Sequence, residues 1–272
     1  MLKARLISAA ILVPLVVCGV LFLSTPVFSA ILAAIMLLAA WEWSHLIPVE
    51  QTVVRVIYTL AMAALMWMLW QAGLSQLVFP LLLLAMIWWL CALFWLSRPQ
   101  LCAVHSALNV NLKLFAGALV ILPAWAALVT LHSGSERGPV LTLMMMVLVW
   151  LADSGAYFAG RQWGKTKLAP AISPGKTWEG VYGGLFSSLV FAAIAGMLFS
   201  KSVKWTLMFM LVAGIAVLFS VAGDLLESLM KRHSGIKDSG NIIPGHGGIF
   251  DRIDGLVAAA PVFLAGYLWL GL

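Results

Sequence analysis

The chain has 272 residues, of which 63% are hydrophobic and only 10% are charged, and its mean hydropathy is +1.05. Soluble domains are nearer half apolar and a quarter charged, so this composition excludes a soluble globular protein. The net charge of +6 does not require a nucleic-acid partner, because basic residues in loops are also the usual signal of membrane topology.

Long apolar runs follow one another along the chain, and each is long enough to cross a hydrocarbon core of about 30 Å as a helix. The apolar residues are continuous rather than alternating, which excludes a transmembrane β-barrel. We therefore predict an all-α, polytopic integral membrane protein. Its nine expected spans are residues 6–23, 27–46, 53–70, 76–96, 114–131, 139–160, 178–198, 205–222 and 253–271.

Basic residues between the spans predict the orientation of the chain. With a cytoplasmic N-terminus, thirteen of the sixteen Lys and Arg residues lie on the cytoplasmic side, and only Arg137, Lys201 and Lys204 lie opposite. This bias agrees with the positive-inside rule. The first span follows the basic tip MLKAR, but no signal-peptidase-like site closes it, so it is expected to be a retained helix.

Acidic residues divide the chain into two parts. In residues 1–138 charges are sparse and fall at helix ends, which indicates a scaffold of membrane helices. Glu42 lies one turn from His45 and could pair with it, but it is expected to reach the interface instead. Residues 139–272 hold seven of the ten acidic residues, namely Asp153, Glu179, Asp224, Glu227, Asp238, Asp251 and Asp254. Carboxylates at a membrane boundary cost free energy unless they are hydrated, paired or bound to a cation, so they indicate a functional site. Residues 139–272 are therefore predicted to be the catalytic part, with cytoplasmic loops 161–177 and 223–253.

Two acidic segments flank the last loop. In GDLLESLMKR, a continued eighth helix would carry on one stripe Asp224, Glu227, Ser228 and Lys231. In FDRIDG, Asp251 and Asp254 share one face at the start of the ninth helix. Converging carboxylates repel one another unless a divalent cation lies between them, and an all-oxygen ligand set suits Mg²⁺. We assign Asp224, Asp251 and Asp254 to Mg²⁺; the alternatives are a stripe that only faces water, or capping carboxylates paired with Arg252 or Lys231.

Glycines and cations in two loops suggest that the ligand carries phosphates. The loop KDSGNIIPGHGG leaves its backbone N–H groups open to an anion, among the cations Lys231, Arg232, Lys237 and His246. GRQWGKT in the earlier loop resembles a P-loop, but it has one residue too few before GK and follows a membrane helix rather than a strand. SPGKT is interpreted as a helix start, with Ser173 or Thr177 as the cap and Lys176 facing an anion; a plain positive-inside anchor is the alternative.

The residues Ser228-x-x-Lys231-Arg232, Lys237-Asp238-x-Gly240 and Pro244-x-His246-Gly247-Gly248-x-x-Asp251-Arg252-x-Asp254 resemble the C-terminal signature of the phosphatidate cytidylyltransferases. The upstream segment from Asp153 through SPGKT is similar to that family too. The resemblance implies a dimeric, Mg²⁺-dependent enzyme that converts CTP and phosphatidate into CDP-diacylglycerol and pyrophosphate at the cytoplasmic membrane face. The bacterial form is the most similar, which implies the bacterial inner membrane.

Residue roles follow from the motifs and the resemblance together. The predicted catalytic residues are Asp224, Lys231, Arg232, Lys237, His246, Asp251 and Asp254. The predicted substrate-binding residues are Asp153, Ser173, Lys176, Thr177, Glu227, Ser228 and Asp238. Three other classes remain as alternatives: an ion-coupled membrane transporter, which would carry charges at mid-span; a CDP-alcohol phosphotransferase, whose DGxxAR motif is absent; and a non-catalytic scaffold.

Overall fold

A computed structural model describes residues 2–47, 49, 51–236, 239–240 and 247–272. Over these ranges the chain forms nine helices and one hairpin: α1 (Leu2–Phe22), α2 (Thr25–His45), α3 (Thr52–Ala72), α4 (Leu74–Ser97), α5 (Ala107–Ser133), α6 (Gly138–Trp163), β1 (Lys167–Ala169), β2 (Ser173–Thr177), α7 (Trp178–Ser200), α8 (Val203–Ser234) and α9 (Phe250–Trp269). Within the described ranges, eight helices are long and apolar enough to cross a membrane, and α1 has a shorter apolar part, Ala10–Phe22. The prediction of an all-α polytopic protein is confirmed.

Helices suit this sequence because a helix satisfies its backbone hydrogen bonds internally, which the interior of a bilayer demands. Large apolar side chains point outward along the helices, and Phe22, Phe79 and Leu198 are each at least 75% exposed. A soluble protein rarely leaves so much apolar surface uncovered, whereas a lipid-facing surface requires it.

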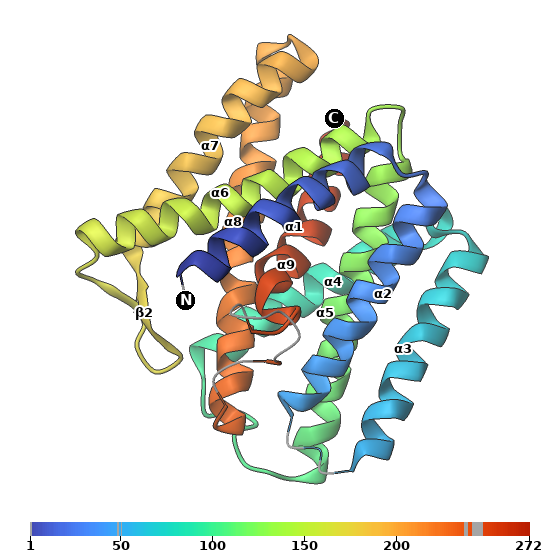
Figure 1. The fold of residues 1–272 in the computed structure, drawn as a ribbon, viewed down its shortest axis with the longest axis vertical. Helices are drawn as coiled ribbons and strands as arrows, with labels where there is room; N and C mark the ends of the chain where they lie inside the picture. The colour runs from blue at the N-terminus through green and yellow to red at the C-terminus, as the bar shows by residue number, and fades with distance from the viewer. Residues whose placement is uncertain (1, 48, 50, 237–238, 241–246) are drawn as a thin grey trace.

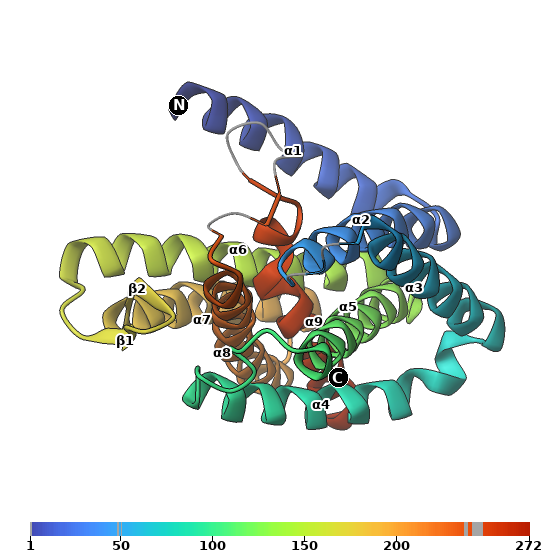
Figure 2. The same cartoon turned by 90° about the horizontal axis from the view of Figure 1, so that it is seen from below.

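Helix α9 lies in the middle of the bundle. It packs against α8 and α5, and also against α4, α6 and α2. Figure 2, which looks along the bundle, shows α9 enclosed between these neighbours. Residues 255–264 of α9 are buried without interruption. The apolar content of this short helix therefore serves the protein core more than the lipid.

Small residues allow the helices of the second half to pack closely. A Cβ atom added at Gly223 of α8 would lie 2.2 Å from the carbonyl oxygen of Asp254 in α9. At the crossing of α6 and α7, a Cβ at Gly183 would lie 2.2 Å from the Cβ of Ala159. Close approach at small residues is typical of membrane helices, and here it draws together the helix ends that carry the acidic residues.

The eighth helix continues past the span of 205–222 expected from the sequence, as the stripe prediction requires. α8 runs unbroken to Ser234 and ends at Gly235, whose φ of 68° is the left-handed conformation common at helix C-termini. α9 begins at Phe250, so Asp251 and Asp254 both lie near its start. Figure 1 shows that α9 begins beside the lower part of α8, which continues beyond it.

The SPGKT segment differs in part from the prediction. Ser173 and Pro174 belong to strand β2, which pairs antiparallel with β1, so the Ser173 alternative for the helix cap is wrong. Thr177 is the cap of α7, and its hydroxyl accepts a hydrogen bond from the Gly180 amide at 3.2 Å. The hairpin between α6 and α7 is a short extension of the helical fold.

Arg137, Lys201 and Lys204, the three cations predicted to lie on the side opposite the site, are found at one end of the bundle. Arg137, between α5 and α6, donates from Nη1 to the carbonyl oxygen of Phe199 at 3.0 Å and lies over that ring. Phe199 is close to the α7–α8 connection, which carries Lys201, and Lys204 lies in the first turn of α8. This grouping places the three cations at one end of the bundle, and the orientation of the chain in the membrane stays a prediction.

Candidate functional site

A cavity of about 660 Å³ opens between α6, α7, α8, α9 and the hairpin. Among the described residues, its charged lining consists of Asp153, Arg161, Lys176, Asp224, Glu227, Lys231, Asp251, Arg252 and Asp254. Val221 and Val217 of α8 line it too, one turn and two turns before Asp224. The lining therefore becomes apolar toward the middle of the helix. A volume of this size is typical of small-molecule sites.

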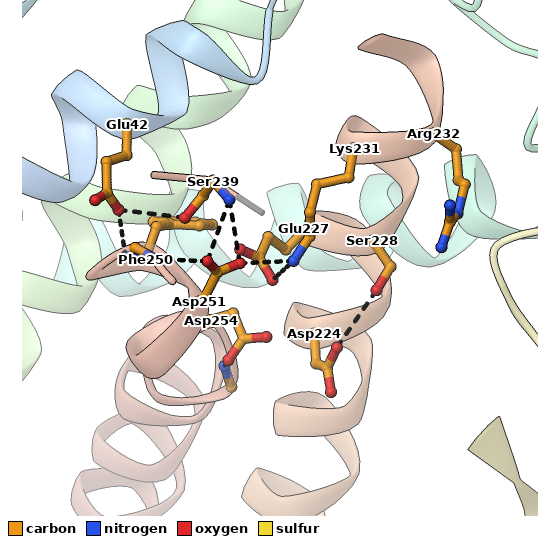
Figure 3. A network of polar contacts seen from close by, with 12 residues as sticks. Glu42, Asp224, Glu227, Ser228, Lys231, Arg232, Ser239, Phe250, Asp251 and Asp254 are labelled. Carbon is orange, nitrogen blue, oxygen red and sulfur yellow. Dashed lines mark hydrogen bonds and ion pairs between the residues drawn. The ribbon is translucent and has the colours of Figure 1, made fainter. Parts of the chain in front are cut away.

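Three carboxylates from two helices converge in the cavity. Asp224, Glu227 and Asp254 each offer an oxygen atom, and these atoms all lie within 4.8 Å of one another. Figure 3 shows the three side chains turned toward the same space between α8 and α9. Glu227 is 1% exposed, and among the described residues its Oε1 has no hydrogen-bond partner. A buried carboxylate oxygen without a partner, beside two more carboxylates, fits an oxygen-ligated divalent cation.

Asp251 is engaged differently from the other acidic residues. Its carboxylate accepts from Lys231 Nζ at 2.7 Å, from the Gly248 amide at 2.7 Å and from the Ser239 amide at 3.1 Å. The sequence placed Asp251 among the metal ligands and gave pairing with Lys231 as the alternative, and the structure contains that pair. Asp251 therefore lines the cavity beside the three converging carboxylates and also holds the backbone at Ser239 and Gly248.

Lys231 joins the two acidic helices. Its Nζ lies 2.8 Å from Glu227 Oε2 and 2.7 Å from Asp251 Oδ1. The ammonium group thus bridges α8 and α9, and both of its carboxylate partners have side chains that are less than 10% exposed. Lys231 lines the cavity, as a phosphate-binding residue must, but part of its charge is already compensated.

Two further cations connect the hairpin with α8. Lys176 Nζ of β2 lies 2.5 Å from Asp224 Oδ2, which places a positive charge next to the carboxylate group. Arg232 is exposed, and its Nε donates to the carbonyl oxygen of Ile172 at 3.1 Å. Arg232 is not among the described residues that line the cavity, so in this arrangement it holds the hairpin rather than the cavity wall.

The remaining predicted residues fall into three groups. Asp153 and Thr177 line the cavity, and their role in substrate binding stays a prediction. Ser173 and Ser228 are outside the described lining, although the Ser228 hydroxyl donates weakly to Asp224 at 3.5 Å. The predicted residues that lie outside the described part of the chain are Lys237, Asp238 and His246.

Sequence reasoning missed some participants. Arg161 and Arg252 line the cavity; the signals available were their positions beside glycines and acids in the two loops and the place of Arg252 in the C-terminal signature. Glu227, predicted to bind substrate, belongs to the converging carboxylates, and its i, i+3 spacing from Asp224 was the available signal. The expectation that Glu42 reaches the interface is wrong, because its side chain is 2% exposed and hydrogen-bonded to residues next to α9.

Comparison with known proteins identifies the family. The sequence model of the cytidylyltransferase family matches residues 3–270. A phosphatidate cytidylyltransferase of Pseudomonas aeruginosa is 45% identical over 270 residues, which cover 99% of this chain and 97% of that protein. One of Haemophilus influenzae is 39% identical over 293 residues, covering 99% of this chain and all of its own length. The similarity extends through the sparsely charged first half, and the chain belongs to the cytidylyltransferase family.

Proposed function

We propose that this protein transfers CMP from CTP to phosphatidate and so produces CDP-diacylglycerol and pyrophosphate. The name shared by its two long relatives supports this reaction. The observation that carries it within the structure is the group of Asp224, Glu227 and Asp254, which lines a cavity together with Lys176 and Lys231. A site that joins two phosphate-bearing substrates needs such a combination of metal ligands and cations.

Mg²⁺ is the proposed metal, held by Asp224, Glu227 and Asp254. This assignment keeps two of the ligands predicted from the sequence and replaces Asp251 with Glu227, because an oxygen of Glu227 converges with those of Asp224 and Asp254, whereas Asp251 accepts from two backbone amides in addition to Lys231. When bound, Mg²⁺ would neutralise phosphate charge during nucleotidyl transfer.

The residues of the chain have mainly positioning and electrostatic tasks. A phosphomonoester such as phosphatidate is largely a dianion at neutral pH, so its attacking oxygen needs no strong general base. That oxygen forms a bond to the α-phosphorus of CTP while the bond to the bridging oxygen breaks and pyrophosphate leaves. Lys176, Arg161 and Arg252 line the cavity where they can hold the phosphates and lower the repulsion between the two anions.

The apolar part of the cavity suggests how the lipid is accommodated. Val181 of α7 lines the cavity, as do Val217 and Val221, which precede Asp224 toward the middle of α8. Acyl chains can lie along these side chains while the lipid phosphate reaches the carboxylate group. We further propose that the site faces the cytoplasm in a bacterial inner membrane, with a cytoplasmic N-terminus, and that the protein is a homodimer as the family resemblance implies.

A direct assay tests the function. The purified protein, incubated with radiolabelled CTP, phosphatidate and Mg²⁺, is expected to produce a labelled CDP-lipid, and chelation of the metal is expected to stop the reaction. Asp224→Asn and Asp254→Asn should each lower the rate by orders of magnitude while the protein still inserts, whereas Lys201→Met, at the opposite end, should not. Near-wild-type rates in both Asn variants would remove the metal assignment.

A further inference from the structure

A carboxylate from the first half of the chain lies at the start of the helix that carries two of the site acids. Glu42 of α2 accepts hydrogen bonds from the backbone amides of Ile249 at 3.0 Å and Phe250 at 2.7 Å. It also accepts one from the hydroxyl of Ser239 at 3.3 Å. Figure 3 shows Glu42 beside Ser239 and Phe250, on the side of α9 away from Asp224.

Helix α9 needs an acceptor at this place. The first amides of a helix have no partner within the helix and carry a partial positive charge. Side chains of Ser, Thr, Asp or Asn usually accept these hydrogen bonds, but the residue at the cap of α9 is Ile249, which has no side-chain acceptor. Glu42 supplies the acceptor from another helix, as a charged group and therefore with stronger hydrogen bonds.

The surroundings hold the Glu42 carboxylate firmly. A Cβ atom added at Gly240 would lie 2.5 Å from Glu42 Oε1, and one at Gly248 would lie 2.5 Å from Oε2, so the backbone closes on the carboxylate from both sides. Next to it, the Trp43 indole packs edge-on against Phe250, and its Nε1 donates to the carbonyl oxygen of Lys113 in α5 at 2.9 Å. The end of α2 is thus fixed to both α5 and α9.

Glu42 and Asp251 hold the same backbone from opposite sides. Asp251 accepts from the amides of Gly248 and Ser239, while Glu42 accepts from the next two amides and from the Ser239 hydroxyl. Asp251 in turn holds Lys231, which bridges to Glu227. A displacement of the start of α9 would therefore move Asp254 and disturb the Lys231 bridge at the same time.

We propose that Glu42 is a positioning residue for the reaction, which fixes the start of α9 and thereby the location of Asp254 and of the Lys231 bridge. Glu42 is outside the described cavity lining, so it acts through other residues and not on a substrate. The inference rests on the proposed function for the reaction concerned, but the placement of α9 can be measured without turnover.

Two variants of the full-length protein separate charge from shape. Glu42→Gln keeps the size of the side chain and removes the charge. We expect kcat to fall about tenfold to a hundredfold, because misplacement of reacting groups by about 1 Å has effects of this size, and KM for CTP to change less than about threefold. Glu42→Asp keeps the charge and should recover part of the loss. The matched control is Glu136→Gln, on an exposed connection at the other end of the bundle, which should behave as wild type.

Hydrogen exchange followed by mass spectrometry gives a readout that does not depend on activity. In Glu42→Gln, amides in peptides covering residues 247–256 should exchange faster, while peptides of α5 and α7 stay at wild-type rates. A wild-type kcat in Glu42→Gln, or unchanged exchange in 247–256, would overturn the proposal. Faster exchange throughout the protein would also overturn it, because Glu42 would then support folding in general.

Coupling with Gly240 provides an independent test. Gly240→Ala adds a methyl group against the Glu42 carboxylate, so it should lower kcat in the wild-type background. In a Glu42→Ala background the methyl group has room, and the same substitution should have little further effect; additive losses in the double variant would contradict the contact. If the wild-type protein yields no CDP-lipid, the proposed function fails, whereas the exchange measurements still decide the role of Glu42.

Discussion

Replacement of Gly223 by Ala should separate the acidic residues of the two helices. Gly223 lies where α8 crosses α9, one residue before Asp224, and an added Cβ would lie 2.2 Å from the carbonyl oxygen of Asp254 and 2.8 Å from the Cβ of Ala258. Neither of these atoms can move away by a change of rotamer, because one belongs to the backbone and the other is attached directly to it. The helices themselves must move apart.

The required movement can be worked out from the contact. An ordinary contact of this kind begins at about 3.4 Å, so a separation of 2.2 Å must grow by about 1.2 Å. Overpacking of this degree destabilises a protein by about 1–3 kcal/mol. Asp224 and Asp254 lie on opposite sides of the crossing and offer oxygens within 4.8 Å of each other, so their separation should widen by a similar amount. We expect kcat to fall about a hundredfold.

Gly214→Ala on the same helix is the matched control. Its added Cβ would meet only the side chains of Leu189 and Leu185, at 3.5 and 3.7 Å, which is ordinary contact. Initial rates of CDP-lipid formation and thermal midpoints should be measured for both variants in the same detergent. If Gly223→Ala retains the rate of Gly214→Ala, the close crossing of α8 and α9 does not hold the acids together, and its role in building the site is refuted.

Three other substitutions test individual contacts. Lys231→Met leaves two little-exposed carboxylates without their cation, so it should lower the free energy of unfolding by about 3 kcal/mol, measured as a lower thermal midpoint. Adding Glu227→Gln should recover part of this loss, and fully additive effects of the two substitutions would argue against the bridge. Thr177→Ala removes the cap of α7 and should cost about 1 kcal/mol in the same measurement, so an unchanged midpoint would show that the cap is dispensable. Lys176→Met should lower kcat/KM for CTP more than tenfold relative to Lys201→Met, and equal values would exclude Lys176 from phosphate binding.

The helices were predictable because a membrane helix needs about twenty mostly apolar residues in a row, a signal that is clear in the sequence. The bounds of α8 and α9 agree with the expected spans except at the ends near the site. The SPGKT segment was harder. Ser173 and Pro174 resemble a helix start in the sequence, but they pair with β1 in a short hairpin. Such pairing depends on contacts between separate segments, which local sequence preferences do not reveal.

The acidic site was predictable in part for a similar reason. Spacing of three residues places Asp224 with Glu227 on one helix and Asp251 with Asp254 on the other, and both predictions of shared faces depend only on helix geometry. The choice among the four acids depends on how the helices are rotated and where Lys231 lies. Lys231 pairs with both Glu227 and Asp251, but Asp251 also accepts from the amides of Ser239 and Gly248, and Glu227 rather than Asp251 joins the converging group.

Glu42 shows how a remote contact could be found from the sequence in similar proteins. An acid at the end of a membrane helix usually reaches water, and nothing near Glu42 contradicts that explanation. The informative feature is 207 residues away, where α9 begins at Ile249 and Phe250 without a capping side chain. A buried helix start without a local acceptor needs one from elsewhere, and few acidic residues remain to provide it. The sparsely charged half of the chain therefore contributes an acceptor on which the acidic half depends.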